Sequence, residues 1–569
     1  MTSFDKWAHP YEYDPRFSKR VAYFSMEFGI NQTLKIFSGG LGFLAGSHMQ
    51  SAYALKQNLI GIGMLWKFGY YDQVRNDDKT MRAQFIKKYY PFLEDTGITV
   101  PVFINQHQVL VKALYLRPEI FGTVPMYLLT TDIPENDYLA TTIMDQLYHS
   151  NHETRAVQNI ILGIGGAKVV DVLGGADVYH LNEGHALPAA FHLYEKYGNV
   201  EAVKEKLVFT THTPEMAGNE EQDIHLLERM GFFANIPLDQ ARKISGQYGD
   251  TLSYTPAALS LARIANGVSQ LHGDVANDMW KDVPGRCEII GITNAQNKAS
   301  WADPELEAAV IADDDEATLT RKQAMKQALF QVVADQTGKI FDPEKLTIVW
   351  ARRFAAYKRA DLIMRDLDRF NNLISNLDRP VQIIWAGKPY PKDEGAISTF
   401  NHIQKYTYRR KNCAVLTGYE MGLSKLLKQG SDVWLNTPRR PREASGTSGM
   451  TAAMNGSVNF SINDGWIPEF AEHGKNSFLI MAAEPNLQLN RIDSLDHEEM
   501  MRVLEDELIP TFYDSPEKWV EILKAGMRDV SPRFDSDRMA TEYYERMYSE
   551  TPIESALHSH RTYNQNVPV

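Results

Sequence analysis

Three basic side chains, Arg352, Arg353 and Lys358, lie around one turn of the segment VWARRFAAYKRADL, where an apolar run that predicts a β-strand gives way to a helix. Arg352 and Arg353 end the strand, and Lys358 follows in the turn. Guanidinium groups present paired N–H donors and the lysine presents a mobile ammonium, and both match the oxygens of a phosphate. A solvated helix face would also carry arginine and lysine. The segment therefore predicts an anion site that needs support from other parts of the chain.

Such support comes from the stretch EASGTSGMTAAMNG, residues 443–456. Its Gly, Ser and Thr residues predict a turn that follows the apolar run at 431–436 and opens into a helix. The first N–H groups of a helix have no partner within it and lie at its positive dipole end, so they favour an anion. We therefore expect the backbone of residues 446–449, together with Arg353 and Lys358, to hold a phosphate or a similar anion.

A second glycine-rich turn, FSGGLGFLAG at residues 37–46, follows the first predicted strand and precedes a helix. Gly39, Gly40 and Gly42 would let the backbone approach a ligand closely, as in phosphate-binding loops. A tight turn with a purely structural role has the same composition, so both interpretations stay open for this segment.

The rest of the chain alternates short β-rich runs with helix-period segments, which is typical of βαβ units whose parallel sheets are covered on both faces. A charged, helix-favouring stretch at 301–333 separates two such series. The first series of predicted strands covers 20–26, 59–66, 108–116, 125–131, 177–182 and 206–212, and the second covers 346–353, 381–388, 413–418 and 432–437.

The two series predict an α/β protein with two doubly wound domains that meet near residues 325–345. Ligands of such sheets bind at the carboxyl ends of the strands, which places the active site in the cleft between the domains. We expect a first domain over 1–330, a second over 340–495, and C-terminal helices over 496–569 that cross back to the first domain and end in a frayed tail. Reactive polar residues stand at the predicted strand ends: Asn182, Glu183, His185, His212, Arg352, Arg353, Lys388 and Asn436.

Composition argues against several classes of function. The chain of 569 residues has 59 Lys and Arg against 72 Asp and Glu, and its net charge of −13 disfavours nucleic acid or an anionic membrane as the partner. The N-terminal residues lack the apolar core of a secretory signal, and no apolar run approaches the ~20 residues of a membrane span. The two cysteines, Cys287 and Cys413, indicate a reducing compartment, and no residue spacing predicts a metal site. We therefore expect a cytoplasmic protein without a bound metal.

A series of motifs across residues 21–470 resembles the α-glucan (glycogen and maltodextrin) phosphorylases, above all their short bacterial and archaeal branch. The resemblance implies a GT-B glycosyltransferase architecture: two Rossmann-like domains, the first on the glucan side and the second on the phosphate side of the cleft. It also implies a homodimer and retaining transfer of a glucosyl unit from an α-1,4-glucan to phosphate, which yields glucose 1-phosphate. The motifs, in chain order, are YFSMEFGI, GGLGFLAG, TDIPEND, HLNEGHA, FTTHTP, NGVSQLHG, ITNAQN, WARRFAAYKRADL and NTPRRPREASGTSGM.

The resemblance also implies roles for the residues that match these motifs. His212 and Asn294 would contact the 6-hydroxyl of the transferred glucose, and Glu443 would bind its 3-hydroxyl. Arg353 and Lys358 would bind the reacting phosphate. No nucleophile is needed in such a site, because a bound phosphate and its donors can stabilise an oxocarbenium-like state. The remaining substrate contacts would be Gly39, Gly40, Leu41, Ser445, Gly446, Thr447 and Ser448, and the neighbouring cofactor pocket would contain Arg352, Tyr357 and Thr451.

Position 451 departs from the family pattern. In the family, the EASGT motif runs on to a lysine that forms a Schiff base with pyridoxal phosphate, and here that place holds Thr451. An imine requires a primary amine, so we expect that the chain carries no covalently bound pyridoxal phosphate. The nearest preceding lysines, Lys425 and Lys428, lie before the strand that leads to the turn, and their spacing does not indicate a substitute. Noncovalent pyridoxal phosphate or a nucleotide stays compatible with the pocket.

Three functions are therefore compatible with the sequence. The first is phosphorylase-type glucosyl transfer, either with free phosphate alone or with noncovalent pyridoxal phosphate. The second is transfer from a sugar nucleotide, because in GT-B enzymes of the glycogen synthase type the donor's distal phosphate lies beside the same Arg and Lys pair. The third is a noncatalytic glucan-binding homologue, against which the complete polar set argues. The expected ligands are an α-glucan or maltodextrin, with phosphate, glucose 1-phosphate or a nucleotide-glucose.

Overall fold

Two β-sheets organise the chain in the computed structural model, which describes residue 4 and residues 6–549. The larger sheet has nine strands in the order β13-β12-β9-β8-β1-β2-β7-β6-β5, and it is parallel except at the end formed by β7, β6 and β5. Its strands are β1 (Val21–Phe24), β2 (Leu59–Met64), β5 (Glu94–Ile104), β6 (His107–Leu116), β7 (Met126–Thr130), β8 (Val178–Asn182), β9 (Leu207–Thr210), β12 (Ile264–Gly267) and β13 (Glu288–Gly291).

The smaller sheet has six strands, all parallel, in the order β16-β15-β14-β17-β18-β19. Its central strand, β14, has the sequence LTIVWA and is buried at each residue, as expected for a parallel strand covered on both faces. The mixed α/β fold with parallel sheets, predicted from the sequence, is confirmed. The strands are β14 (Leu346–Ala351), β15 (Val381–Ala386), β16 (Cys413–Leu416), β17 (Val433–Asn436), β18 (Val458–Ile462) and β19 (Ser477–Ile480).

Strand β5 is not predicted by the alternation of apolar runs in the sequence. This strand is the outermost of its sheet and contains Pro101, which has no N–H to donate to a neighbouring strand. A proline inside an apolar run counts against a central strand, but an edge strand tolerates it. The sheet therefore ends in an antiparallel extension that the βαβ pattern alone does not reveal.

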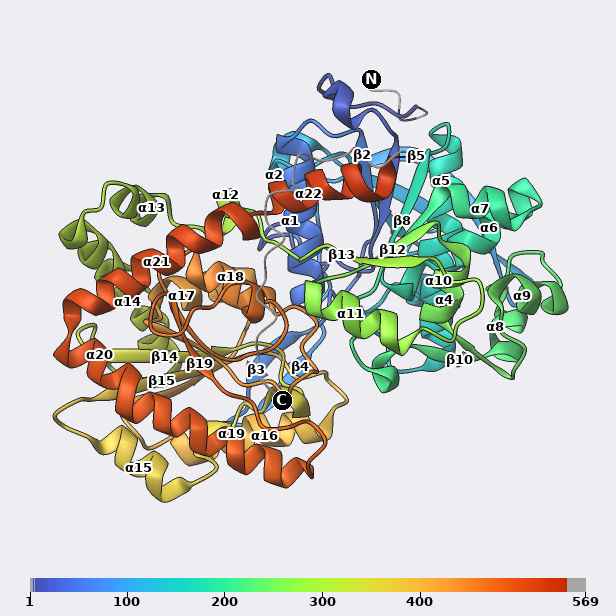
Figure 1. The fold of residues 1–569 in the computed structure, drawn as a ribbon. Helices are drawn as coiled ribbons and strands as arrows, with labels where there is room; N and C mark the ends of the chain where they lie inside the picture. The colour runs from blue at the N-terminus through green and yellow to red at the C-terminus, as the bar shows by residue number, and fades with distance from the viewer. Residues whose placement is uncertain (1–3, 5, 550–569) are drawn as a thin grey trace.

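Helices connect the strands in both halves of the molecule (Figure 1). The helices between the strands of the larger sheet are α1 (Gly40–Ala54), α2 (Pro118–Phe121), α3 (Tyr138–Thr142), α4 (His152–Ile160), α5 (Gly166–Val172), α6 (Pro188–Tyr197), α7 (Val200–Lys206), α8 (Ile224–Met230), α9 (Leu238–Ser245), α10 (Tyr254–Leu261) and α11 (Gln270–Met279). After β13 follow α12 (Lys298–Trp301), α13 (Pro304–Ile311), α14 (Asp315–Thr337), α15 (Leu367–Ser375), α16 (Glu394–Thr407), α17 (Met421–Gly430) and α18 (Thr447–Ala453).

Helix α14 lies within the charged stretch that separates the two predicted series. Asp314 caps its start by accepting from the backbone N–H of Ala317, and Gly338, at φ 69°, ends it in the left-handed conformation. Its buried Leu329 and Val333 pack in one cluster with β14 and β15 of the smaller sheet. The helix is therefore part of the layer that covers the smaller sheet.

A small hairpin from the first half of the chain contacts the second half. It consists of β3 (Asp72–Arg75) and β4 (Met81–Gln84). The Gln73 amide donates to the carbonyl of Gly387 at 2.9 Å, and the Tyr71 hydroxyl, just before the hairpin, donates to the carbonyl of Pro389 at 2.6 Å. These contacts hold the loop after β15 against the first half.

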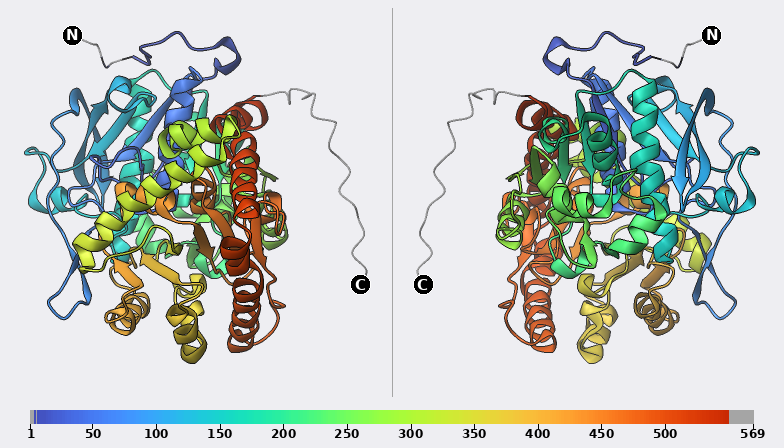
Figure 2. Two further views of the ribbon diagram at one scale, coloured as in Figure 1. Left: turned by 90° about the vertical axis from the view of Figure 1, so that its left-hand side faces the viewer. Right: turned by 90° about the vertical axis from the view of Figure 1, so that its right-hand side faces the viewer.

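The last helices run from the smaller sheet back to the first half of the chain (Figures 1 and 2). Val530 and Phe534 of α21 pack with Trp466 beside the smaller sheet. The Ser536 hydroxyl at the start of α22 lies 2.6 Å from the Ser51 hydroxyl of α1. The predicted frayed tail lies outside the described residues. The helices are α19 (Leu489–Val503), α20 (Ile509–Asp514), α21 (Pro516–Phe534) and α22 (Ser536–Tyr543).

Three further features bear on function. No helix in the described part of the chain combines the length and the apolar composition that crossing a membrane requires. Within the same residues, no group of three or more His, Cys, Asp or Glu side chains is arranged to hold a metal ion. Cys287 and Cys413 are both buried, and neither forms a disulfide.

Candidate functional site

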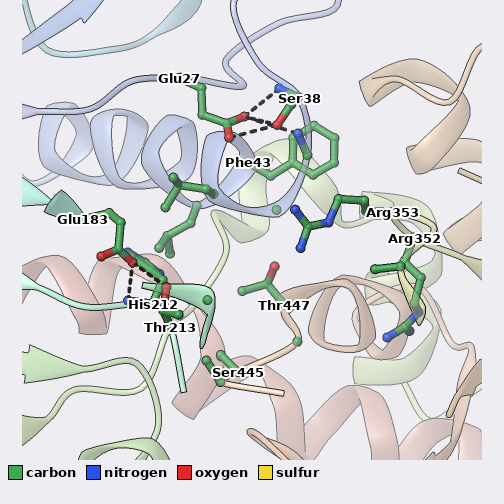
Figure 3. Close-up of a pocket in the computed structure, with 18 of the residues that line it drawn as sticks. Glu27, Ser38, Phe43, Glu183, His212, Thr213, Arg352, Arg353, Ser445 and Thr447 are labelled. Atoms are coloured by element: carbon green, nitrogen blue, oxygen red, sulfur yellow. Dashed lines mark hydrogen bonds between the residues drawn. The ribbon is translucent and has the colours of Figure 1, made fainter. Parts of the chain in front are cut away.

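Loops that follow strands of both sheets line one cavity of about 650 Å³, which is the size of a typical small-molecule site. The predicted substrate residues lie around it: Gly39, Gly40, Leu41, His212, Asn294, Arg353, Lys358, Glu443, Ser445, Gly446, Thr447 and Ser448. Figure 3 shows Arg353 and Thr447 on one side of the open space and Glu183 and His212 on the other. Segments more than 200 residues apart in the sequence therefore meet here.

The two adjacent arginines have different environments. Arg353 is exposed, and Figure 3 shows its guanidinium directed toward the open space and Thr447. Arg352 is buried, donates to the side-chain oxygen of Asn436, and reaches the Ser448 hydroxyl at 3.4 Å. An arginine held by protein partners positions its surroundings, whereas an arginine that faces a cavity can bind a ligand anion. Arg353 is therefore the arginine available to the reacting phosphate, while Arg352 lines the cavity beside Ser448 and keeps further N–H donors for a second anion there.

Lys358 and Glu443 both line the cavity and form an ion pair there. Its ammonium lies 3.2 Å from a carboxylate oxygen of Glu443, and the Arg352 guanidinium lies 3.9 Å from that carboxylate. The backbone N–H of Glu443 donates to Asp464 at 3.0 Å, which orients the loop. Burial raises the pKa of Asp464 to about 7. Glu443 thus lies next to two cations, and its remaining acceptor capacity can serve a sugar hydroxyl.

The predicted glycine-rich turn leads into α18. Gly446 precedes the helix at φ 92°, a left-handed conformation that side chains rarely adopt. Thr447 and Ser448 begin the helix, where backbone N–H groups have no partner within it. The Ser445 hydroxyl is buried and has no hydrogen-bond partner among the described residues. The turn therefore offers unused polar groups at the cavity.

His212 and Asn294 also line the cavity. The Nε2 atom of His212 lies 2.7 Å from the Asn182 side-chain oxygen, which can only accept, so Nε2 carries the proton and Nδ1 is free to accept. Burial lowers the pKa of His212 to about 3, so the imidazole is neutral near pH 7. The Asn294 side-chain oxygen is buried without a partner among the described residues. Both side chains can accept a hydrogen bond from a hydroxyl.

The glycine loop at 39–41 is held by Glu27. The carboxylate of Glu27 accepts from the backbone N–H groups of Ser38 and Gly39 at 2.6 and 3.2 Å, and from the Ser38 hydroxyl at 2.9 Å. A Cβ atom added to Gly40 would meet nothing within 4 Å, whereas one added to Gly42 would lie 2.6 Å from the Glu27 carboxylate. Gly40 thus leaves space toward the cavity, and Gly42 allows the loop to pack.

Glu183 is a site residue that the sequence analysis flagged only as one of several polar residues at strand ends. Its backbone is at φ 68°, which is rare for a residue with a side chain. Its carboxylate accepts from the backbone N–H of His212 at 2.8 Å and from the Thr213 hydroxyl at 3.2 Å. Burial raises the pKa of Glu183 to about 7. Backbone strain at a cavity wall is a mark of functional sites.

Two predicted cofactor-pocket residues do not line the cavity. Thr451 is fully buried, and its hydroxyl donates to the Ser448 carbonyl at 3.1 Å within α18. Tyr357 lies behind Lys358, whose ammonium is 5.3 Å from the centre of the tyrosine ring. Lys428, in contrast, lines the cavity although its sequence spacing indicated no role there.

Comparison with known proteins identifies the family to which this chain belongs. Residues 305–505 match the family described as carbohydrate phosphorylase. The chain is 33% identical to a maltodextrin phosphorylase of Thermococcus litoralis over 98% of its own length and 72% of that protein. The chain belongs to the carbohydrate phosphorylase family. This family member is also 32% identical to a glycogen phosphorylase of Mycobacterium tuberculosis, over 93% of its own length and 70% of that protein.

An uncharacterized protein of Methanocaldococcus jannaschii is more similar still, at 46% identity over 93% of this family member and the whole of the other chain. The resemblance drawn from the motifs is thus confirmed at the level of the family, which places the chain among glycosyltransferase-type enzymes of carbohydrate metabolism.

Proposed function

We propose that the chain catalyses retaining glucosyl transfer between the end of an α-1,4-glucan and phosphate. The observation that carries this proposal is the arrangement of one cavity, in which Arg353 and Thr447, at the start of α18, lie across the open space from neutral His212, and whose lining includes Asn294. The first group suits a phosphate and the second suits sugar hydroxyls. The names of relatives, glycogen phosphorylase and maltodextrin phosphorylase, support the same reaction.

In the proposed reaction, the bond between the terminal glucosyl C1 and its glycosidic oxygen breaks. The departing oxygen takes a proton from hydrogen phosphate, and a phosphate oxygen bonds to C1 on the face that the glucan leaves. The products are the shortened glucan and glucose 1-phosphate. Arg353 and Lys358 hold the phosphate charge, while Glu443, His212 and Asn294 orient the sugar. Positioning and charge stabilisation of the oxocarbenium-like state supply the rate, without a protein nucleophile.

We further propose that the two sheets belong to the Rossmann-like domains of a GT-B architecture, with the glucan and the phosphate entering the cleft between them. The cavity lining supports this, because His212 and Asn294 follow strands of the larger sheet and Arg353 follows a strand of the smaller one. A cytoplasmic location and a homodimer accompany the proposal as expectations from the resemblance.

Pyridoxal phosphate is the cofactor that the resemblance implies. The cavity offers contacts for its phosphate group, but residue 451 offers no amine for a covalent bond to its aldehyde. Arg352 and Ser448, near the start of α18, would hold a phosphate group, and the ring centre of Tyr357 lies 5.3 Å from the Lys358 ammonium. Thr451 has no amine, and its hydroxyl is engaged by Ser448. When bound, the cofactor supplies an ionisable phosphate that can give a proton to the reacting phosphate. We propose that no covalent link forms at Thr451.

The absence of an amine at position 451 also favours one alternative, transfer from a nucleotide-glucose. A nucleotide would occupy the space beside Arg352, with its distal phosphate on Arg353 and Lys358. A noncatalytic homologue would bind glucan and transfer nothing.

One screen distinguishes these functions. The purified chain is incubated with maltodextrin and phosphate, then with maltodextrin and glucose 1-phosphate, and then with maltodextrin and a panel of nucleotide-glucoses. Release of glucose 1-phosphate in the first reaction and chain extension in the second are expected. Extension only with a nucleotide-glucose would overturn the phosphate proposal in favour of the alternative, and glucan binding without transfer would overturn both.

A further inference from the structure

A buried lysine lines the cavity without any hydrogen bond or ion pair to the residues that the structure describes. Lys428 lies on α17, with an exposed fraction of 1%. Its ammonium position is 3.8 Å from the centre of the Trp301 ring and 5.6 Å from that of Phe43. A buried lysine is normally paired, because a lone charge is costly to remove from water. This amine needs another explanation.

The environment of Lys428 disfavours the charged form of the amine. Burial is the main cause, and the positive charge of Arg352 adds to it, so the pKa of Lys428 lies well below its usual range. No carboxylate contributes to that shift. An unprotonated primary amine has a free electron pair, which makes it a nucleophile toward carbonyl carbon. The amine is thus prepared for chemistry that a charged surface lysine performs poorly.

Lys428 also lies near the helix that carries residue 451. The side-chain amide of Asn455 donates to the carbonyl of Trp301 at 3.0 Å and to the carbonyl of Thr451 at 2.8 Å. Trp301 is the ring beneath the Lys428 amine. Asn455 therefore links Trp301, which contacts Lys428, to Thr451, the α18 residue that stands in place of the family's lysine.

The geometry points to Lys428 as the amine that forms an imine with a phosphate-bearing aromatic aldehyde in this cavity. Trp301 and Phe43, packed edge to face with ring centres 5.2 Å apart, form an aromatic wall beside the amine. Arg352 and the start of α18 supply the phosphate contacts. Pyridoxal phosphate belongs to this chemical class, so the inference rests on the proposed function for the identity of the cavity's cofactor.

The step balances without another reactant. The Lys428 nitrogen attacks the aldehyde carbon, and the two protons of the amine leave with the carbonyl oxygen as one water. The product is a carbon–nitrogen double bond, and nothing is oxidised or reduced. Lys428 therefore revises the prediction of a chain without covalently bound pyridoxal phosphate, which rested on residue 451 and on the spacing of Lys425 and Lys428.

Lys425 provides a matched control on the same helix. It lies one turn before Lys428, and its ammonium donates to the carbonyl of Ser300 at 2.8 Å. It does not line the cavity. Both lysines precede the same strand, so sequence position alone does not separate them, whereas the direction of their side chains does.

The test is to incubate the full chain with pyridoxal phosphate, remove the excess, record the visible absorbance of an imine, reduce with borohydride, and map the adduct by peptide mass analysis. One adduct per chain, on Lys428, is expected. Lys428→Met should lose the absorbance and the adduct, and Lys425→Met should keep both. Pyridoxal, which lacks the phosphate, should require at least about tenfold higher concentration, because it lacks charge-assisted contacts.

An adduct on any other lysine, or unchanged labelling of folded Lys428→Met, would overturn the assignment. Equal labelling by pyridoxal would overturn the phosphate-bearing part of it. Mapping on the unsubstituted chain needs no variant, so a misfolded variant would not remove the test. The readouts are also independent of transfer activity: an adduct on Lys428 in a chain that transfers no glucosyl unit would refute the proposed function and leave this inference in place.

Discussion

Replacement of Arg353 by alanine should weaken phosphate binding strongly and change the stability of the fold little. Arg353 is exposed to the cavity and has no ion pair to a carboxylate among the described residues, so its removal leaves no buried charge behind. Hydrogen bonds to charged groups contribute about 1.5–3 kcal/mol each. Loss of one such contact corresponds to roughly a ten- to hundredfold weaker affinity for phosphate, because each 1.36 kcal/mol is tenfold.

The affinity is measured by calorimetric titration with inorganic phosphate, together with the rise in melting temperature that phosphate produces. Arg353→Ala should show both the weaker affinity and the loss of that rise. Arg365→Ala is the matched control, since Arg365 follows the same strand region but bonds to Asn490 and Ser494 away from the cavity. An affinity for Arg353→Ala within twofold of the unsubstituted chain would refute the assignment of the phosphate to this arginine.

Three further predictions concern the loop, the strained acid and position 451. Gly42→Ala should destabilise the protein by about 1–3 kcal/mol, because the new Cβ would overlap the Glu27 carboxylate. Gly40→Ala should keep the melting temperature of the unsubstituted chain and lose transfer activity. Equal melting temperatures of the two variants would contradict this prediction. The raised pKa of Glu183, about 7, means that the fold binds its proton more tightly than the unfolded chain does, so this contribution to stability is lost as pH rises from about 4.5 to 7. Glu183→Gln should reduce that slope in denaturant titrations, and an unchanged slope would count against the shift. Thr451→Lys should take up pyridoxal phosphate on residue 451, visible as a borohydride-reduced adduct, and gain or raise phosphorolysis of maltodextrin. An adduct on neither residue 451 nor Lys428 would indicate a pocket rebuilt for another ligand.

Local patterns were sufficient for most of the framework. The runs at 346–353 and 432–437 became β14 and β17, because a continuous apolar run suits a strand covered on both faces. The turn before Thr447 places Gly446 at positive φ, and the glycine-rich composition of the segment predicted such a turn. The outer strand β5 was missed because its proline gives the pattern of a break, and only its place at the sheet edge makes it compatible with pairing.

The sequence by itself determined the family and the residue types that the cavity holds, since these depend on motifs that are contiguous in the chain. Tertiary structure decided which way the side chains point. It turned Arg352 toward Asn436 and left Arg353 facing the cavity, it enclosed Thr451 inside α18, and it brought Lys428 to the cavity wall. Residue spacing predicts the element on which a side chain stands, but its direction and protonation depend on what other elements pack around it. Such packing joins segments that lie far apart in the sequence, as Trp301 does beneath Lys428.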